Sequence, residues 1–276
     1  MVYGTFTEGF TYTSTSRCVN KGVLRSPLTP CEAISGMYHF SVDVVKRSDG
    51  RSVVAAVAYP SGARLTDERL GKTFDYGRKK GIVAARIMAP EGAPEWVHDR
   101  GQLWNKVETA EKRKDAQLAR QIVISLPAEL SANGRAELIF DFVRTHFVAA
   151  GMIADVALHD PDAANPQPHA HVHLTMRRLD ADGFGPKARE WNDTGLLEGW
   201  RVAWAEAANA ALEAEGHAGR LDHRSLEAQR ADWQARADAA PDPRSRQRAL
   251  IEVVRLTYIP QPSIGRAAWA AMAKGQ

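Results

Sequence analysis

The 276-residue chain is poor in cysteine: Cys18 and Cys31 are its only two, and both lie near the N-terminus. The cysteine-free remainder excludes iron–sulfur clusters and cysteine-based zinc sites from most of the chain. Few cysteines also suit a protein of the reducing cytoplasm, and nothing in the sequence demands a disulfide between these two.

Long apolar runs are also missing. A membrane-spanning helix needs about 18 or more successive apolar residues, and no such run occurs. The N-terminus lacks the basic region and apolar core of a secretory signal. We therefore expect a cytoplasmic protein without membrane insertion.

Several short nucleotide-binding and metal-binding motifs are absent as well. The chain has no Walker phosphate loop, no dinucleotide-binding glycine fingerprint and no His-Glu-x-x-His helix of metalloproteases. Its formal net charge is only +3, which is compatible with nucleic-acid binding but does not argue for it. The hydrophobic content of 44% fits a globular protein with a real core.

Composition changes along the chain suggest three parts. Residues 1–36 are rich in Ser, Thr and Gly, carry few charges and show no clear periodicity, so we expect a poorly ordered leader. A native N-terminal hairpin is the alternative. The functional domain is expected at 37–226, and a helical C-terminal extension at 227–276.

Histidines form the most informative pattern. Residues 168–175 hold His169, His171 and His173 at two-residue spacing, which puts the three imidazoles on one face of a β-strand. His159 ends an earlier apolar run, and the loop between the two strands brings it beside this row. Imidazoles converging from neighbouring strands are typical of a metal site. The alternative is a strand whose polar face happens to be rich in histidine.

Hydrophobic patterning predicts an α+β fold, in which helices flank a central, largely antiparallel sheet. The segments 64–80 and 177–191 are polar. We expect a loop or surface strand with a positive face for the first and a loop for the second. Strands are expected at 37–45, 82–89, 121–127, 152–158 and 168–175, and helices at 51–59, 99–119, 131–150, 196–215 and within 225–256.

A metal on the histidine strand does not determine which group is the nucleophile. Metal-bound water would make a hydrolase, whereas a protein side chain would form a covalent intermediate. Tyr59 is a candidate because it ends a small-residue helix that lets a large substrate approach. Composition alone does not choose it over Tyr38, Tyr76 or Tyr258.

An ordered set of motifs narrows these alternatives. Together they resemble the relaxase domain of the MobA/MobL family, the conjugative DNA-nicking proteins of mobile plasmids. The resemblance runs from residue 37 to about 226. Its motifs are Tyr-His-Phe at 38–40, the small-residue helix 51–59, Leu-Trp-Asn-Lys-Val-Glu at 103–108, Glu-Lys-Arg-Lys at 111–114, Leu-Ala-Arg at 118–120, His159, Pro-His-Ala-His at 168–171 and Leu-Asp-His-Arg-Ser-Leu at 221–226.

The resemblance implies a fold and a chemistry. The fold is that of the His-hydrophobe-His endonucleases, Tyr59 is the nucleophile, and His159, His169 and His171 are the metal ligands. His173 is then a neighbour of the ligands or faces DNA. The implied reaction is metal-dependent transesterification at an origin of transfer, through a 5′-phosphotyrosine link that religation reverses. The implied cofactor is a divalent ion, Mn or Mg first and Zn as a further candidate.

One position departs from the family pattern. Family members tend to carry glutamate where this chain has Gln121. A carboxylate there could orient a ligand histidine or help deprotonate the tyrosine, whereas glutamine can only form hydrogen bonds. Larger relatives continue into helicase or primase regions, and we expect this chain either to borrow strand separation from elsewhere or to be a truncated copy.

The implied partners are single-stranded origin DNA, accessory proteins of the relaxosome and a type IV coupling protein. Single-stranded DNA requires cations and aromatic platforms. A non-catalytic DNA-binding module and a metal-water phosphodiesterase are the alternatives to a relaxase. The expected DNA contacts come from the basic segment 64–80 and from Arg51, Arg64, Lys72, Arg177, Arg178, Lys187, Arg189 and Trp191.

Overall fold

The structure is a computed structural model that describes residues 38–160, 167–180 and 183–257. The expected leader at 1–36 lies outside these residues. The last part of the C-terminal extension, 258–276, lies outside them as well, so the proposed outer boundaries stay predictions.

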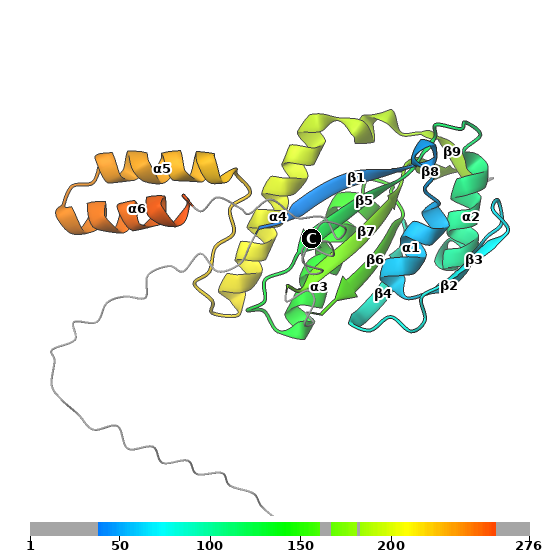
Figure 1. Cartoon of the computed structure of the whole chain (residues 1–276), viewed down its shortest axis with the longest axis horizontal. Helices are drawn as coiled ribbons and strands as arrows, with labels where there is room; N and C mark the ends of the chain where they lie inside the picture. The colour runs from blue at the N-terminus through cyan, green and yellow to red at the C-terminus, as the bar shows by residue number, and fades with distance from the viewer. Residues whose placement is uncertain (1–37, 161–166, 181–182, 258–276) are drawn as a thin grey trace, which may run out of the picture. The chain divides into compact units, whose positions relative to one another are not determined.

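Five strands form the central sheet, in the spatial order β1-β5-β7-β6-β4. Every neighbouring pair in it runs antiparallel. Figure 1 shows these strands side by side, with helices around them. The α+β class and the antiparallel sheet are therefore confirmed. The strands are β1 (Phe40–Lys46), β4 (Ile82–Met88), β5 (Gln117–Ser125), β6 (Ala154–His159) and β7 (His169–Thr175).

Different helices cover the two faces of the sheet. α3 (Ala132–Val143) and α4 (Thr194–Ala214) pack on one face, against the even-numbered apolar residues of β7. α1 (Val53–Ser61) and α2 (Arg100–Ala110) belong to a second apolar core. Because side chains alternate along a strand, the histidines of β7 face α1 and α2.

The expected helix at 99–119 begins as predicted but ends early. The Asp99 side chain caps α2 by accepting a hydrogen bond from the backbone N–H of Gln102. The helix ends at Ala110, so the predicted end was wrong. The residues from Gln117 onward pair with β1, and this strand pairing buries Leu118 and outweighs their helical propensity.

Two small hairpins lie in the polar segments. β2 (Arg64–Asp67) pairs with β3 (Lys72–Asp75), which confirms the surface-strand alternative there. β8 (Arg177–Asp180) pairs with β9 (Gly183–Lys187), so the loop expected over 177–191 was wrong. Short 3-10 helices span Arg47–Asp49, Glu95–His98 and Arg189–Asn192, and a π-helix spans Arg144–Val148.

Two helices lie within 225–256, where helices were expected. α5 (Leu226–Asp238) and α6 (Pro243–Arg255) pack against each other. Pro243 stands in the first turn of α6, where its missing N–H costs no helical hydrogen bond. Within the described residues, no helix has the length and apolar character needed to cross a membrane.

Candidate metal centre and its tyrosine

Three histidines converge where β6 ends and β7 begins. His159 lies opposite His169 in the strand register, and His171 follows two residues along β7. The ring centroids are 5.0 Å apart for His159 and His169, 4.9 Å for His159 and His171, and 5.1 Å for His169 and His171. One ligand nitrogen from each ring lies within 4.8 Å of the other two. The structure thus brings the three predicted ligands together and leaves His173 outside the group.

The cluster fits a metal ion chemically. Three imidazole nitrogens bound to one ion lie roughly 3–3.5 Å apart, so small side-chain rotations would close the set. Nδ1 of His171 is buried and has no hydrogen-bond partner among the described residues. Burial lowers the pKa of His171 to about 3, and the neighbouring His159 adds to this effect. The ring is therefore neutral at physiological pH, which is the form that binds a metal.

The C-terminal end of α1 meets this cluster. Nε2 of His159 lies 2.7 Å from the carbonyl oxygen of Pro60. A carbonyl only accepts, so Nε2 carries the proton and Nδ1 presents the lone pair. Tyr59 immediately precedes Pro60, and its side chain is 50% exposed. This contact joins α1, the helix that carries Tyr59, to a histidine 99 positions after Pro60 in the sequence.

Two further side chains surround Tyr59. The ring of Tyr76 packs edge-on against it, with centroids 5.2 Å apart. Nζ of Lys79 lies 3.9 Å from the centroid of the Tyr59 ring, a cation–π geometry. The charge of Lys79 also contributes to the low pKa of His171. Sequence reasoning treated Lys79 only as part of a basic segment, because nothing local marks its position beside the tyrosine.

Polar contacts brace the N-terminal end of α1. Oγ of Ser52 accepts from the N–H of Ala55 and donates to buried Asp67 at 2.6 Å. A carboxylate oxygen of Glu108 accepts from the N–H of Val53. An oxygen acceptor at a helix N-terminus satisfies free N–H groups and suits the helix dipole.

Glu108 is buried and does more than brace the helix. It forms ion pairs with Arg47 at 2.7 Å and with Arg69 at 3.0 Å. Its neighbour Asn105 bonds to the backbone at Thr66 and Glu68. The motif at 103–108 therefore holds α1 and β2 in place, a role that its sequence did not reveal.

His173 lies further along β7 and is only 1% exposed. It faces Asp155 across the β6–β7 pair, and Asp155 in turn accepts two hydrogen bonds from Arg100 and one from Trp104. Burial lowers the pKa of His173 to about 4, although Asp155 opposes this shift. The alternative that His173 faces DNA was therefore wrong.

Gln121 lies opposite His173 in the β5–β7 register. Its side-chain oxygen accepts a 3.0 Å hydrogen bond from Arg51, which also forms an ion pair with Asp43 at 2.7 Å. A glutamate at 121 would make this contact charge-assisted, whereas glutamine keeps a neutral acceptor. Arg51, expected to contact DNA, is engaged with protein groups.

The DNA contacts expected from the β8–β9 region need correction. Trp191 is 4% exposed and belongs to the larger core, so its ring is closed to stacking bases. Arg177 and Lys187 both pair with buried Glu111, at 2.8 and 3.3 Å. β7 continues for four residues past His171, roughly 13 Å, before the chain turns into the separate β8–β9 hairpin.

Four other cations stay predictions as DNA contacts. Arg64 and Lys72 are exposed on the β2–β3 hairpin, which packs beside α1. Arg189 is exposed near β9. Arg178 is also exposed, although it pairs with Glu190.

Comparison with known proteins gives this site its context. Residues 51–242 match the sequence model of the MobA/MobL family, which is well over half of the chain. The chain belongs to the MobA/MobL family. The matched range contains Tyr59, the three clustered histidines and the bracing residues of α1.

Two curated relatives are longer than this chain. Mobilization protein MobL of Acidithiobacillus ferridurans is 38% identical over 221 residues, which cover 68% of this chain and 58% of that protein. Conjugal transfer protein TraA of Agrobacterium fabrum is 38% identical over 226 residues, which cover 70% of this chain and 20% of that protein. This chain thus spans little more than half of one relative and a fifth of the other.

A solved structure supports the fold. It comes from work on the molecular basis of vancomycin resistance transfer in Staphylococcus aureus. Its sequence is 34% identical to this chain, and the two structures align with a TM-score of 0.64. The alignment covers 69% of this chain and 100% of the solved one.

Proposed function

We propose that the protein is a relaxase: it nicks one DNA strand at an origin of transfer and rejoins it through a covalent link to Tyr59. The observation that carries this proposal is the contact between Pro60 and His159, which holds the end of α1 against the histidine cluster. The names of the relatives, mobilization and conjugal transfer proteins, indicate the biological setting.

In the proposed reaction, the phenolic oxygen of Tyr59 attacks the phosphorus of the scissile phosphodiester. The bond from phosphorus to the 3′ oxygen breaks, Tyr59 gives up its proton, and the leaving 3′ oxygen takes up a proton. The 5′ phosphate stays esterified to the tyrosine. Because one ester replaces another, the reverse step can rejoin the strand.

The residues of the cluster would hold a divalent ion through His159, His169 and His171. Mn and Mg are the first expectations, and Zn also suits imidazole ligands. When bound, the ion supplies positive charge to the non-bridging phosphate oxygens. Lys79 adds a cation at the face of the Tyr59 ring, and the Pro60 contact holds the end of α1 that carries Tyr59 at His159.

Covalent attachment tests the proposal. The full chain with Mn²⁺ is incubated with labelled single-stranded oligonucleotides tiling the replicon that encodes it, and is then run on a denaturing gel. We expect one oligonucleotide to give a labelled protein band. Tyr59→Phe should remove the band, whereas the matched control Tyr76→Phe should keep it. Equal labelling of Tyr59→Phe and the wild type would reject the nucleophile.

The same gel separates the alternatives. A metal-water phosphodiesterase would give a free 5′-phosphate end and no protein adduct. A non-catalytic module would retain single-stranded DNA in a native gel without cutting it. Either result with correctly folded protein would overturn the relaxase proposal.

The setting follows as part of this proposal. Single-stranded origin DNA is the substrate, and accessory relaxosome proteins and a type IV coupling protein are the proposed partners. We place the reaction in the cytoplasm, where a donor plasmid is accessible.

A further inference from the structure

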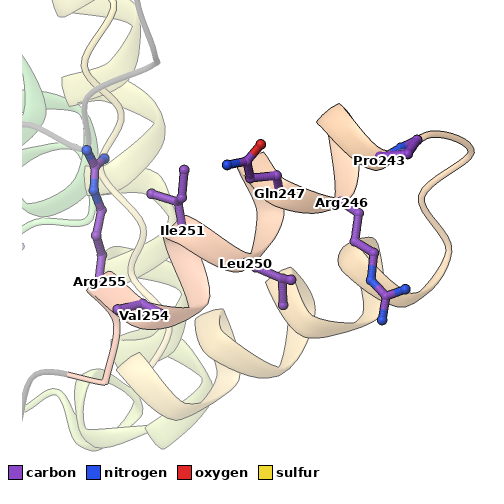
Figure 2. Close-up of a pocket in the computed structure, with 7 residues that line it drawn as sticks. All are labelled: Pro243, Arg246, Gln247, Leu250, Ile251, Val254 and Arg255. Carbon is purple, nitrogen blue, oxygen red and sulfur yellow. The ribbon is translucent and has the colours of Figure 1, made fainter.

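α6 carries an apolar strip that its neighbour α5 leaves open. Leu250, Ile251 and Val254 are 37%, 44% and 69% exposed. Apolar side chains gathered in this way on a surface mark an interaction site. The helix is also basic, with four arginines and one glutamate. Figure 2 shows the residues that line this face: Pro243, Arg246, Gln247, Leu250, Ile251, Val254 and Arg255.

A groove of opposite character runs between α3 and α4. Its apolar part comes from Leu138, Phe142, Ala207 and Ala211. No lysine or arginine is among the residues that line it. Burial lowers the pKa of its histidine, His146, so that ring is uncharged near neutral pH. The carboxylates of the groove are those of Glu137, Asp141 and Glu215.

Two of these carboxylates give the groove its negative charge. Glu215 accepts hydrogen bonds from the N–H and hydroxyl of Ser131, at 2.9 and 2.8 Å, and these bonds lower its pKa. Glu137 is exposed. Asp141 is partly neutralised by its ion pair with Arg144.

We propose that α6 of one copy of this chain lies in the α3–α4 groove of a second copy. The apolar strip would cover the apolar floor while Arg246 and Arg255, on the same face of α6, meet the carboxylates, which is the helix-in-groove mode of recognition. The lengths match, because residues 243–255 and the α3 side of the groove, 134–146, each span roughly 18 Å. A reciprocal exchange closes into a dimer with two identical contacts.

The joint between α4 and α5 favours a second copy over the same chain. The side chain of Asn209 holds the backbone of Leu221 through two hydrogen bonds, at 2.6 and 2.9 Å. Arg224 pairs with Asp222 at 2.6 Å, and Gln229 donates to the carbonyl of Arg224 at 2.7 Å. These contacts hold the segment 222–225 between α4 and α5. They oppose the rotation of α5 and α6 about this segment that docking of α6 into the groove of the same chain would require.

Charge and chemistry disfavour two other occupants of the α6 face. Two basic α6 helices would repel each other, so a contact between the same faces is unfavourable. DNA would meet aliphatic side chains at the centre of this face, where a phosphate backbone finds no partner.

Sedimentation of the full chain tests the proposal, over a wide range of protein concentration and at low and high salt. We expect a dimer that salt weakens. Arg246→Glu and Glu137→Arg should each raise the dissociation constant by about tenfold or more, because both contacts then pair like charges. Arg248→Glu makes the same charge change on α6, but outside the face that enters the groove. It should therefore leave the dissociation constant of the dimer unchanged. Circular dichroism checks that each variant is folded.

Mixing the two weakened variants gives the sharpest test. In their heterodimer, one contact brings the α6 helix of the Arg246→Glu variant against the groove of the Glu137→Arg variant, so opposite charges meet again. The other contact is wild type. The mixture should therefore dimerise as tightly as the wild type. Monomer at all concentrations, a dimer that ignores both substitutions, or a mixture that fails to recover would each overturn the proposal. A protein that stays monomeric and binds single-stranded DNA through α6 would overturn it as well.

Discussion

His173 stands at the buried end of the histidine row, where its charge has no access to water. The free imidazole titrates near 6.5, and burial lowers the pKa of His173 in the folded protein to about 4. Between these values the unfolded chain binds the extra proton and the folded chain does not. The free energy of unfolding therefore falls as the pH drops through this window.

We predict that His173 alone costs the metal-free protein about 3 kcal/mol of stability between pH 6.5 and pH 4. Urea unfolding at several pH values measures the effect. His173→Gln should flatten the pH dependence, and a matched change at exposed His98 should not. An unchanged slope in His173→Gln would show that other groups, such as His171, dominate the acid sensitivity.

At this scale, a sequence indicates which residue types can do chemistry but not which are accessible. The spacing of His159, His169 and His171 and the order of the motifs were enough to predict the cluster that the structure assembles. Trp191 was misread because an aromatic residue next to cations looks the same in sequence whether it is buried or exposed. The neighbours that cover its ring include Gly151 and Arg178, which lie 40 and 13 positions earlier in the chain.

α1 is the element on which the candidate site depends, since it carries Tyr59 at one end. Gly62 ends it in the left-handed region, with a φ of 64°. A Cβ added there would lie 2.5 Å from Cδ1 of Ile82 on β4, so Ile82 would have to rotate. Gly71 in the β2–β3 turn has a similar φ of 60° but open space around it.

We predict that Gly71→Ala costs about 1 kcal/mol from backbone strain alone. Gly62→Ala should cost about 1 kcal/mol more, because of the added crowding, and should slow adduct formation by shifting the end of α1. Urea unfolding gives the two free energies, and the denaturing gel gives the two rates. Equal behaviour of the two variants would mean that the end of α1 tolerates displacement.

Element boundaries were the less predictable part. The small apolar residues predicted the helix α1 at 51–59, but it spans Val53–Ser61, because Ser52 caps its start and Pro60 lies inside it. The helix at α2 was extended too far, since residues 111–119 have helical propensity but the register with β1 places the last of them in β5. Propensity is local, whereas strand pairing is decided by partners far away in the sequence.

For the whole molecule, the metal would add a link between β6 and β7, two paired strands that α1 contacts through Pro60. His159 belongs to β6, His169 and His171 belong to β7, and Pro60 links α1 to His159. An ion that binds only the folded state stabilises it by about 3 kcal/mol at a hundredfold excess over its dissociation constant.

We predict that saturating Mn²⁺ raises the melting temperature of the wild type by roughly 5–10 °C. His171→Ala should abolish this rise, whereas a matched substitution of exposed His98 should keep it. Differential scanning calorimetry with and without a chelator measures both. A rise that persists in His171→Ala would place the ion elsewhere in the protein.

The sequence by itself determined the fold class, the histidine strands and the family, because period-two alternation and motif order are properties of the chain alone. Only the tertiary structure decided what lies around Tyr59. Lys79 and Tyr76 contact its ring from outside the helix, His159 contacts the next residue, Pro60, and Glu108 contacts the start of its helix from α2. Such neighbours depend on long-range packing, for which local sequence carries no signal.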